Sequence, residues 1–335
     1  MFGRWLQRQW FQRRLSPALW LLLPFFLPLH AVFVLVSNRR RRTARVVRLP
    51  VPVIVVGNLI VGGAGKTPLT LAVVRALGER GFRPGIVSRG YGRQGDALMA
   101  VDAVAEAKIV GDEPLLLARR AACPVWVGKK RVDAARALLV ASPEVDVIVC
   151  DDGLQHYALG RDVALAVFDR RGAGNGWCLP LGPLRESLER LATVDAVIGN
   201  ECDVSALAAG KPAFSMHLQA ATFVRLGKAA QRCTAADLVG KTLHAVAGIG
   251  DPQRFFDTLA ALGLHCFTHP FPDHHAYVAA DLDFGPDAVL LMTEKDAVKC
   301  AGLVTGEAWC LPVEAIVPPA LIDLIVEKVR GRPIA

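Results

Sequence analysis

The feature that most constrains this chain is a glycine-rich loop between an apolar run and a helical segment. Residues Val53 to Ala76 read VIVVGNLIVGGAGKTPLTLAVVRA, in the order strand, loop, helix that is typical of a phosphate-binding P-loop. In such a loop the backbone N–H groups turn toward an anion, Lys66 adds a positive charge, and the Thr67 hydroxyl can reach Mg²⁺. The segment predicts a nucleoside triphosphate site. The predicted nucleotide-binding residues are Gly62, Gly63, Ala64, Gly65, Lys66, Thr67 and Pro68.

The beginning of this loop departs from the usual spacing. In the pattern G-x-x-x-x-G-K-[ST] the first glycine would fall at Ile60, whereas the chain has Gly57 earlier and Gly62 and Gly63 later. We therefore expect the first part of the loop to have a different shape. The alternative is a glycine-rich turn that binds no ligand. The residue preferences of turns, however, do not explain why Lys66 and Thr67 follow the clustered glycines.

Apolar strand-like runs alternate with helical segments along the chain. The expected strands are 53–56, 85–88, 125–127, 145–150, 163–168 and 196–198, and the expected helices are 68–80, 113–122, 130–141 and 186–191. This alternation predicts an α/β fold with a doubly wound, mostly parallel sheet of the P-loop NTPase type. Thr67 and Asp112 are expected to cap two of the helices. Ligands of such sheets bind at the carboxyl ends of the strands, where the P-loop, Ser88–Gly92 and Asp151–Gly153 would meet.

The pattern changes near residue 210, where we place a domain boundary. We expect a basic and apolar membrane anchor over residues 1–45, a P-loop core over 46–210 and a smaller α/β domain over 211–335. Short alternating residues between Met216 and Leu226 predict a β-ribbon that joins the last two parts. A strand at 244–247 then leads into a turn, with Asp251 as the N-cap of a helix that starts at Pro252.

The N-terminal segment from Leu15 to Val36 is apolar and has no formal charge. Roughly 20 such residues are about enough to cross a hydrocarbon core of ~30 Å. Pro24 and Pro28 interrupt helical hydrogen bonding and His30 adds a polar group, so a kinked or interfacial segment is the alternative to a span. A cleaved signal peptide fits less well, because four arginines follow the apolar run in place of a small-residue cleavage site.

Basic residues flank this apolar segment. Of the net charge of +8, ten arginines lie before residue 49, where there is no acidic residue, so the rest of the chain is nearly neutral. Because these arginines lie beside a membrane anchor, we expect them to bind anionic lipid headgroups and not nucleic acid. They also favour a cytoplasmic location for the domain that follows. Eight scattered cysteines without a Cys-x-x-Cys pair fit that reducing compartment. We expect the cytoplasmic face of a membrane, with membrane lipids as partners and no obligatory protein partner.

Several carboxylates follow apolar runs, where Mg²⁺ chemistry would need them. The expected strand 145–150 ends in Asp151 and Asp152, which resembles a Walker B element, and Thr67 would supply a second ligand. The alternative is an acidic turn without a metal, since the sequence Asp-Asp-Gly also favours a tight turn. Asp112 and Glu113 open a helix, which suits a cap, and they are also candidates for a base or a metal ligand.

Two further motifs lie in the second domain. Phe271 to His275 combines a turn with adjacent imidazoles, although neighbouring histidines are more often surface residues than ligands. Residues Thr293 to Asp296 follow the expected strand 288–292. The sequence leaves two roles open for them: binding a nucleotide base, or forming a salt bridge at the end of the strand.

Taken together, these residues resemble the tetraacyldisaccharide 4'-kinases of lipid A synthesis. The resemblance covers nearly the whole chain in seven ordered blocks: VGNLIVGGAGKTP, SRGYG, GDEPLLLA, DDGLQH, GNGWCLPLGPLRE, PDHH and MTEKDAVKC. One departure is Leu181, where the family usually has a smaller residue.

The resemblance implies transfer of the ATP γ-phosphoryl group to the 4'-hydroxyl of an acylated glucosamine disaccharide 1-phosphate, with Mg²⁺ as cofactor. It also implies that this occurs at the cytoplasmic face of the inner membrane, where the acyl chains of the substrate stay. By the same resemblance, Asp112 would accept the hydroxyl proton, His274 would orient Asp112, and Lys66 would bind the β and γ phosphates. The implied metal ligands are Thr67, Asp151, Asp152, Glu113 and Glu186. The implied substrate-binding residues are Tyr91, Arg131, Gln155, His156 and Arg185.

A membrane-bound P-loop ATPase switch of the partitioning or cell-division type is the alternative function. Its Gly-Gly-x-Gly-Lys-Thr loop is similar, but such switches carry a signature lysine immediately before the paired glycines. This chain has Val61 there. A permanent anchor also fits poorly with reversible membrane cycling.

Overall fold

The computed structural model describes residues 2–12, 14–220, 222–300 and 302–332. Its larger sheet has nine strands in the order β15-β8-β7-β6-β1-β5-β2-β4-β3. Their bounds are β1 Val53–Gly57, β2 Pro84–Ser88, β3 Met99–Ala100, β4 Val125–Val127, β5 Val147–Asp151, β6 Val163–Asp169, β7 Ala196–Asn200, β8 Ala213–Ala220 and β15 Val313–Ile316. All pairs are parallel except β3 with β4 and β15 with β8, so the expected doubly wound, mostly parallel sheet is confirmed.

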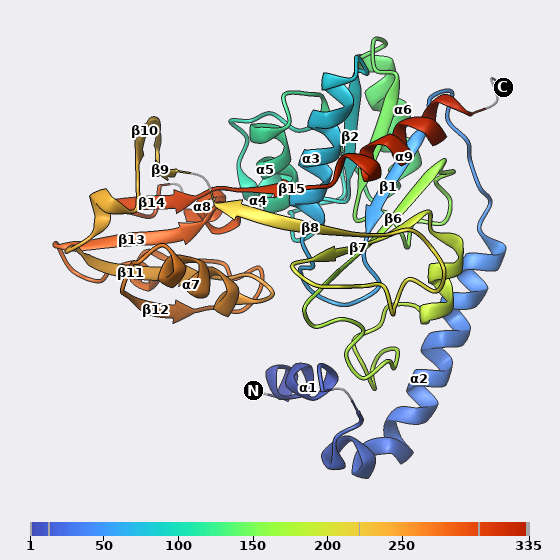
Figure 1. Cartoon of the computed structure of the whole chain (residues 1–335), viewed down its shortest axis with the longest axis horizontal. Helices are drawn as coiled ribbons and strands as arrows, with labels where there is room; N and C mark the ends of the chain where they lie inside the picture. The colour runs from blue at the N-terminus through green and yellow to red at the C-terminus, as the bar shows by residue number, and fades with distance from the viewer. Residues whose placement is uncertain (1, 13, 221, 301, 333–335) are drawn as a thin grey trace.

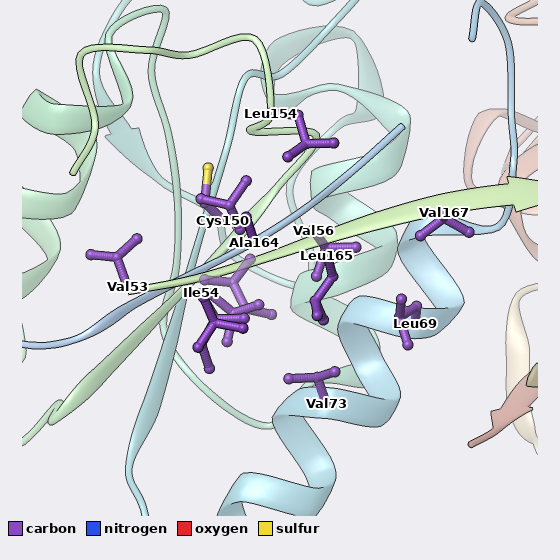
Figure 2. Packing of buried hydrophobic residues seen from close by; sticks show 14 of the residues in the cluster. Val53, Ile54, Val56, Leu69, Val73, Cys150, Leu154, Ala164, Leu165 and Val167 are labelled. Atoms are coloured by element: carbon purple, nitrogen blue, oxygen red, sulfur yellow. The ribbon is translucent and has the colours of Figure 1, made fainter. Parts of the chain in front are cut away.

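Strand β1 lies at the centre of this sheet and is buried along its whole length. Helix α3 packs over it, and Figure 2 shows Leu69 and Val73 of this helix beside Val56 of β1 and Leu165 of β6. Burial on both faces explains why β1, β5 and β6 are continuous apolar runs. The other helices of this part are α4 Ala107–Val110, α5 Asp112–Arg120, α6 Arg131–Ala141 and α9 Pro319–Arg330, and α3 spans Lys66–Glu79.

The smaller sheet has six strands in the order β10-β9-β14-β13-β11-β12. They are β9 Phe223–Arg225, β10 Lys228–Cys233, β11 Thr242–Ala247, β12 Cys266–Pro270, β13 Ala288–Thr293 and β14 Glu307–Leu311. Helices α7 Pro252–Ala261 and α8 Glu294–Cys300 pack on it. Strands β11 to β14 are parallel, so the second part is also α/β.

Strands β8 and β15 pair antiparallel and run from the larger sheet toward the smaller one (Figure 1). We propose that this pair is the ribbon that joins a P-loop core to a C-terminal domain. Although they follow residue 210, β8, β15 and α9 belong to or pack on the larger sheet. The division at residues 45 and 210 stays a prediction.

The N-terminal segment consists of helix α1 Phe2–Trp10 and helix α2 Pro17–Thr43, which projects from the body (Figure 1). Pro24 and Pro28 lie inside α2, and the helix continues through both, although each proline removes one backbone donor. Within the described residues, α2 is the one helix long and apolar enough to cross a membrane. Only Leu19 of it is buried, and Phe33 and Val34 pack partly against the core of the larger sheet, whereas Trp20, Leu21, Phe25 and other apolar side chains of α2 are exposed.

The N-terminal segment contacts the loop that follows β6. The Trp10 indole donates to the carbonyl of Pro180 at 2.8 Å, and the amide of Asn175 donates to the carbonyl of Trp10 at 2.8 Å. His30 forms a hydrogen bond with the carbonyl of Cys178 at 3.0 Å and packs edge-on against Trp177. The loop 172–184 is therefore a docking surface for the segment that we expected only to anchor.

Local details differ from the sequence-based expectations at two helix starts. Thr67 lies inside α3, whose N-cap is Gly65, and Asp112 is the first residue of α5, whose N-cap is Gly111. Asp251 is the N-cap of α7, which begins at Pro252 as expected, although its side chain makes no capping hydrogen bond and its carboxylate pairs with Arg170 at 2.8 Å. Residues 186–191 were expected to be a helix, and the structure has a 3₁₀ helix at Leu188–Thr193.

Candidate active site

The P-loop leaves the carboxyl end of β1 and enters α3 at Lys66. Gly62 and Gly65 have φ angles of 88° and 95°, a region that favours glycine. A Cβ on Gly65 would also overlap the Asn200 amide, so glycine is required there for two reasons. Lys66 and Thr67 are the first two residues of α3, which places both at a helix N-terminus, where an anion is stabilised.

The paired aspartates at the end of β5 have different surroundings. Asp151 is fully buried, and one of its oxygens accepts a hydrogen bond from Thr70 at 3.0 Å. Burial and the negative charge of Glu113 raise its pKa. Burial also raises the pKa of Asp152. The positive charges of Lys66, 3.7 Å away, and of Arg185, 3.2 Å away, outweigh this effect and lower the pKa of Asp152 to about 2. Asp152 is thus ionised at neutral pH.

The residues present fit a magnesium ion at Asp151. Its Oδ2 atom is buried and has no hydrogen-bond partner among the described residues, and a cation would satisfy this oxygen. Within the described part of the chain, no three His, Cys, Asp or Glu side chains form a ready-made metal cluster. Water and phosphate oxygens would therefore have to complete the coordination, as is usual for Mg²⁺.

Asp112 and His274 meet across the two sheets. His274 Nδ1 lies 3.1 Å from Asp112 Oδ2, although 162 residues separate them in sequence. Burial raises the pKa of Asp112, but the hydrogen bond with His274 and the charge of Lys295 outweigh it, so the net pKa is lowered. The same hydrogen bond raises the pKa of His274. The Tyr91 ring lies 5.1 Å from the His274 ring, so Tyr91 belongs to the same site.

Lys295 connects this pair with two further carboxylates. Its Nζ lies 3.0 Å from Glu113, 3.3 Å from Asp273 and 3.3 Å from His274 Nε2. Burial opposes its charge, but Glu113 and Asp273 raise its pKa, so the ammonium group stays charged. The neighbouring Asp296 is fully buried and binds the Gly248 amide and the Tyr277 hydroxyl, which is a structural role.

The remaining predicted residues form a second group beside Asp152. The Arg131 amide donates to His156 Nε2 at 3.2 Å, and the Arg131 guanidinium donates to the carbonyl of Asp152 at 3.3 Å. Burial and the charges of Arg131 and Arg161 lower the pKa of His156 to about 4, so this imidazole is neutral.

Gln155 and Glu186 complete this group. Gln155 donates to Glu186 at 3.0 Å, and Glu186 also pairs with Arg190 at 3.4 Å. Glu186 and Glu113 are therefore both occupied by protein partners, unlike Asp151 Oδ2. Side chains that we predicted from separate motifs thus lie in two linked clusters beside the P-loop.

Comparison with known proteins shows which family the chain belongs to. Residues 19–330 match the family described as Tetraacyldisaccharide-1-P 4'-kinase. The chain belongs to the tetraacyldisaccharide 4'-kinase family. It is 61% identical over 337 residues to the tetraacyldisaccharide 4'-kinase of Dechloromonas aromatica, which covers 100% of both chains. The corresponding protein of Aromatoleum aromaticum is 49% identical and covers 96% of this chain and 99% of its own.

A solved kinase of this family has the same fold. The crystal structure of LpxK from Aquifex aeolicus in complex with ATP superposes with a TM-score of 0.76 and 27% identity, covering 93% of this chain and 99% of its own. This confirms the fold class for a tetraacyldisaccharide 4'-kinase. The alternative of a partitioning-type ATPase switch is not favoured.

Our sequence analysis of this kinase missed several residues around the P-loop. Asn58, Arg171 and Asn200 each donate to a P-loop carbonyl, and Thr70 donates to Asp151. Asn58, Arg171 and Asn200 lie at or within two residues of the carboxyl ends of β1, β6 and β7. Their place at strand ends was a usable signal, because ligands of parallel sheets bind at that edge.

Proposed function

We propose that this chain transfers the γ-phosphoryl group of ATP to the 4'-hydroxyl of a membrane-embedded, acylated glucosamine disaccharide 1-phosphate. Membership of the kinase family gives the reaction and the lipid disaccharide substrate. The observation that carries the mechanism is the contact between Asp112 and His274, which brings a carboxylate and an imidazole from the two sheets to one place beside the P-loop.

In the proposed reaction Asp112 accepts the proton of the 4'-hydroxyl. As the O–H bond breaks, the sugar oxygen forms a bond to the γ-phosphorus, and the bond from that phosphorus to the bridging oxygen breaks to release ADP. His274 orients Asp112 through Nδ1, and Lys295 holds the other imidazole nitrogen. Positioning of this kind supplies much of the rate enhancement in phosphoryl transfer.

The phosphates of ATP would lie on the P-loop, at Gly62 to Pro68. Lys66 would contact the β and γ phosphates in place of its present neighbour Asp152. When bound, Mg²⁺ would supply positive charge that offsets the negative charge of the phosphate oxygens. We propose Asp151 and Thr67 as its direct ligands, because Asp151 Oδ2 lacks a partner, with Asp152, Glu113 and Glu186 acting from further away.

The disaccharide would bind where the two clusters meet. Tyr91 is exposed beside His274, so its ring is available to a sugar. Arg185 presents a planar guanidinium that suits a bidentate grip on a phosphate, and Arg131, Gln155 and His156 lie behind it. These residues are proposed to select the lipid headgroup.

Helix α2 is proposed to insert into the inner membrane and to hold the kinase at its cytoplasmic face. Trp20, Leu21 and Phe25 are exposed, at 61%, 80% and 72%, and the arginines at 39–42 follow near the helix end. Such a surface binds an interface that contains anionic lipid. This arrangement would bring the active site to a substrate whose acyl chains stay in the bilayer.

Replacing Trp20 and Phe25 by serine is expected to weaken binding to vesicles with anionic lipid at least tenfold, because each buried aromatic side chain contributes roughly 1.5–3 kcal/mol. ATP affinity should stay unchanged. Sedimentation with vesicles measures the first quantity and nucleotide titration the second. Val140→Ser is the matched control, since Val140 is 81% exposed on α6, away from α2. Equal vesicle binding by the double variant and the wild type would contradict the insertion.

The function is tested by incubating the full chain with γ-labelled ATP, Mg²⁺ and detergent-dispersed disaccharide 1-phosphate lipid. We expect the label in the lipid fraction. Label released as orthophosphate, at a rate indifferent to the lipid, would instead support an ATPase and contradict the proposal.

A further inference from the structure

Three consecutive carbonyl oxygens of the P-loop each accept a hydrogen bond from a side chain. Asn58 Nδ2 donates to Gly62 at 3.1 Å, Arg171 Nη2 to Gly63 at 2.6 Å and Asn200 Nδ2 to Ala64 at 3.0 Å. The three donors come from the ends of β1, β6 and β7, so they approach the loop from separate parts of the sheet edge.

These bonds fix the direction of the backbone amides. In a planar trans peptide the carbonyl of one residue and the N–H of the next point to opposite sides. A donor that holds the carbonyls of Gly62, Gly63 and Ala64 therefore turns the N–H groups of Gly63, Ala64 and Gly65 away from itself. An anion-binding loop needs N–H groups that point together, and a glycine loop without such donors would lose this order to its own flexibility.

Arg171 is itself held rigidly. Its guanidinium pairs with Asp169 at 2.7 Å, and its Nε lies 3.0 Å from both oxygens of the same carboxylate. Its charged carbon lies 4.6 Å from the centre of the Phe11 ring, which covers it. The Nε and one N–H of Nη2 thus bind the Asp169 carboxylate, and Nη2 also donates to the Gly63 carbonyl.

The Asn200 amide is also oriented by a partner. Arg254 Nη2 donates to Asn200 Oδ1 at 2.9 Å, so the amide nitrogen faces Ala64. Asn200 and Asn58 are both buried, which makes each donor hard to replace by water. Within the described residues, the hydrogen bonds of these three side chains go to the P-loop, Asp169 and Arg254, and not to Asp112 or His274.

We propose that Asn58, Arg171 and Asn200 are positioning residues that preset the P-loop backbone for the phosphates of ATP. The inference rests on the proposed function, since it concerns the nucleotide of the same reaction. Arg171 carries the clearest test, because it is the charged member and Phe11 and Asp169 hold its position.

Arg171→Ala is expected to raise the Kd and the KM for MgATP about tenfold, the effect of losing one charge-assisted hydrogen bond. The KM for the lipid and the kcat at saturating ATP should stay within about threefold, because ordered ATP restores the loop. Arg171→Lys keeps a donor without the fork and should recover part of the affinity. Arg136→Ala, an exposed arginine of α6, is the matched control and should behave as the wild type.

Asn200→Asp supplies a second, independent measurement, since it replaces the amide donor by a carboxylate of the same shape opposite the Ala64 carbonyl. We expect a loss of MgATP affinity at least as large as that of Arg171→Ala. Thermal unfolding without nucleotide, within a few degrees of the wild type, would show that the variants are folded.

The inference is overturned if Arg171→Ala binds MgATP as the wild type does, or if its loss appears only in the lipid KM. Failure of the wild type to bind MgATP would overturn the proposed function together with the inference. These two failures are distinguishable in the same titration.

Discussion

Asp112→Ala is expected to lower kcat by about 10²- to 10⁴-fold, the range for loss of a general base, while MgATP affinity stays close to that of the wild type. A group that acts on the sugar hydroxyl contributes in the transition state and not to binding of the other substrate. Asp112 is buried and ionised beside His274, so its carboxylate is available for a proton. Single-turnover kinetics and nucleotide titration separate the two quantities.

Asp112→Asn sharpens this test, because it keeps the shape and can still accept a hydrogen bond from the Glu113 amide, which now lies 3.0 Å from Asp112 Oδ1. It cannot accept the proton and should be about as slow as Asp112→Ala. Glu106→Gln is a suitable control, since this residue is the N-cap position of α4 and makes no side-chain cap bond there. If Asp112→Asn lost MgATP affinity in proportion to rate, Asp112 would be a metal ligand instead of a base.

Lys66→Ala should reduce kcat/KM for ATP by about 10²- to 10³-fold, as does removal of one preorganised charged contact in other enzymes. Lys66 is buried at the start of α3, and its ammonium lies 3.7 Å from Asp152. The substitution removes the charge that meets the phosphates and leaves Asp152 with the positive charges of Arg185 and Arg131. Both the KM for ATP and kcat should therefore change.

Lys129→Ala is the control for this prediction, because Lys129 is exposed and pairs only at the surface with Asp96. Surface pairs of this kind contribute little, so the variant should be as active as the wild type. A Lys66→Ala protein with ATP kinetics close to those of the wild type would contradict the placement of phosphates on this loop.

The larger sheet was predictable because its strands carry local signals. Burial on both faces makes β1 a continuous apolar run, and the glycines before Lys66 mark the following turn. The 3₁₀ turn at 188–193 was not distinguished from an α-helix, since short segments of both kinds share the same apolar spacing.

The contacts between residues of the site were harder to predict from the sequence than the strands were. The pairing of Asp112 with His274 came from the family resemblance, because no local pattern relates residues 162 positions apart. Asn58, Arg171 and Asn200 were missed although they lie at or near strand ends, since the backbone carbonyls that they contact carry no sequence signature of their own. The docking of Trp10 on the loop at Pro180 was missed for the same reason.

The most direct test of the account is the position of the new phosphate on the lipid. Correlation of ³¹P with ¹H signals in the product formed by the wild-type chain from ATP and disaccharide 1-phosphate should show a new phosphomonoester coupled to the proton at the 4'-carbon. The 1-phosphate signal should stay unchanged. A new signal coupled to another sugar proton, or a diphosphate at position 1, would contradict the account.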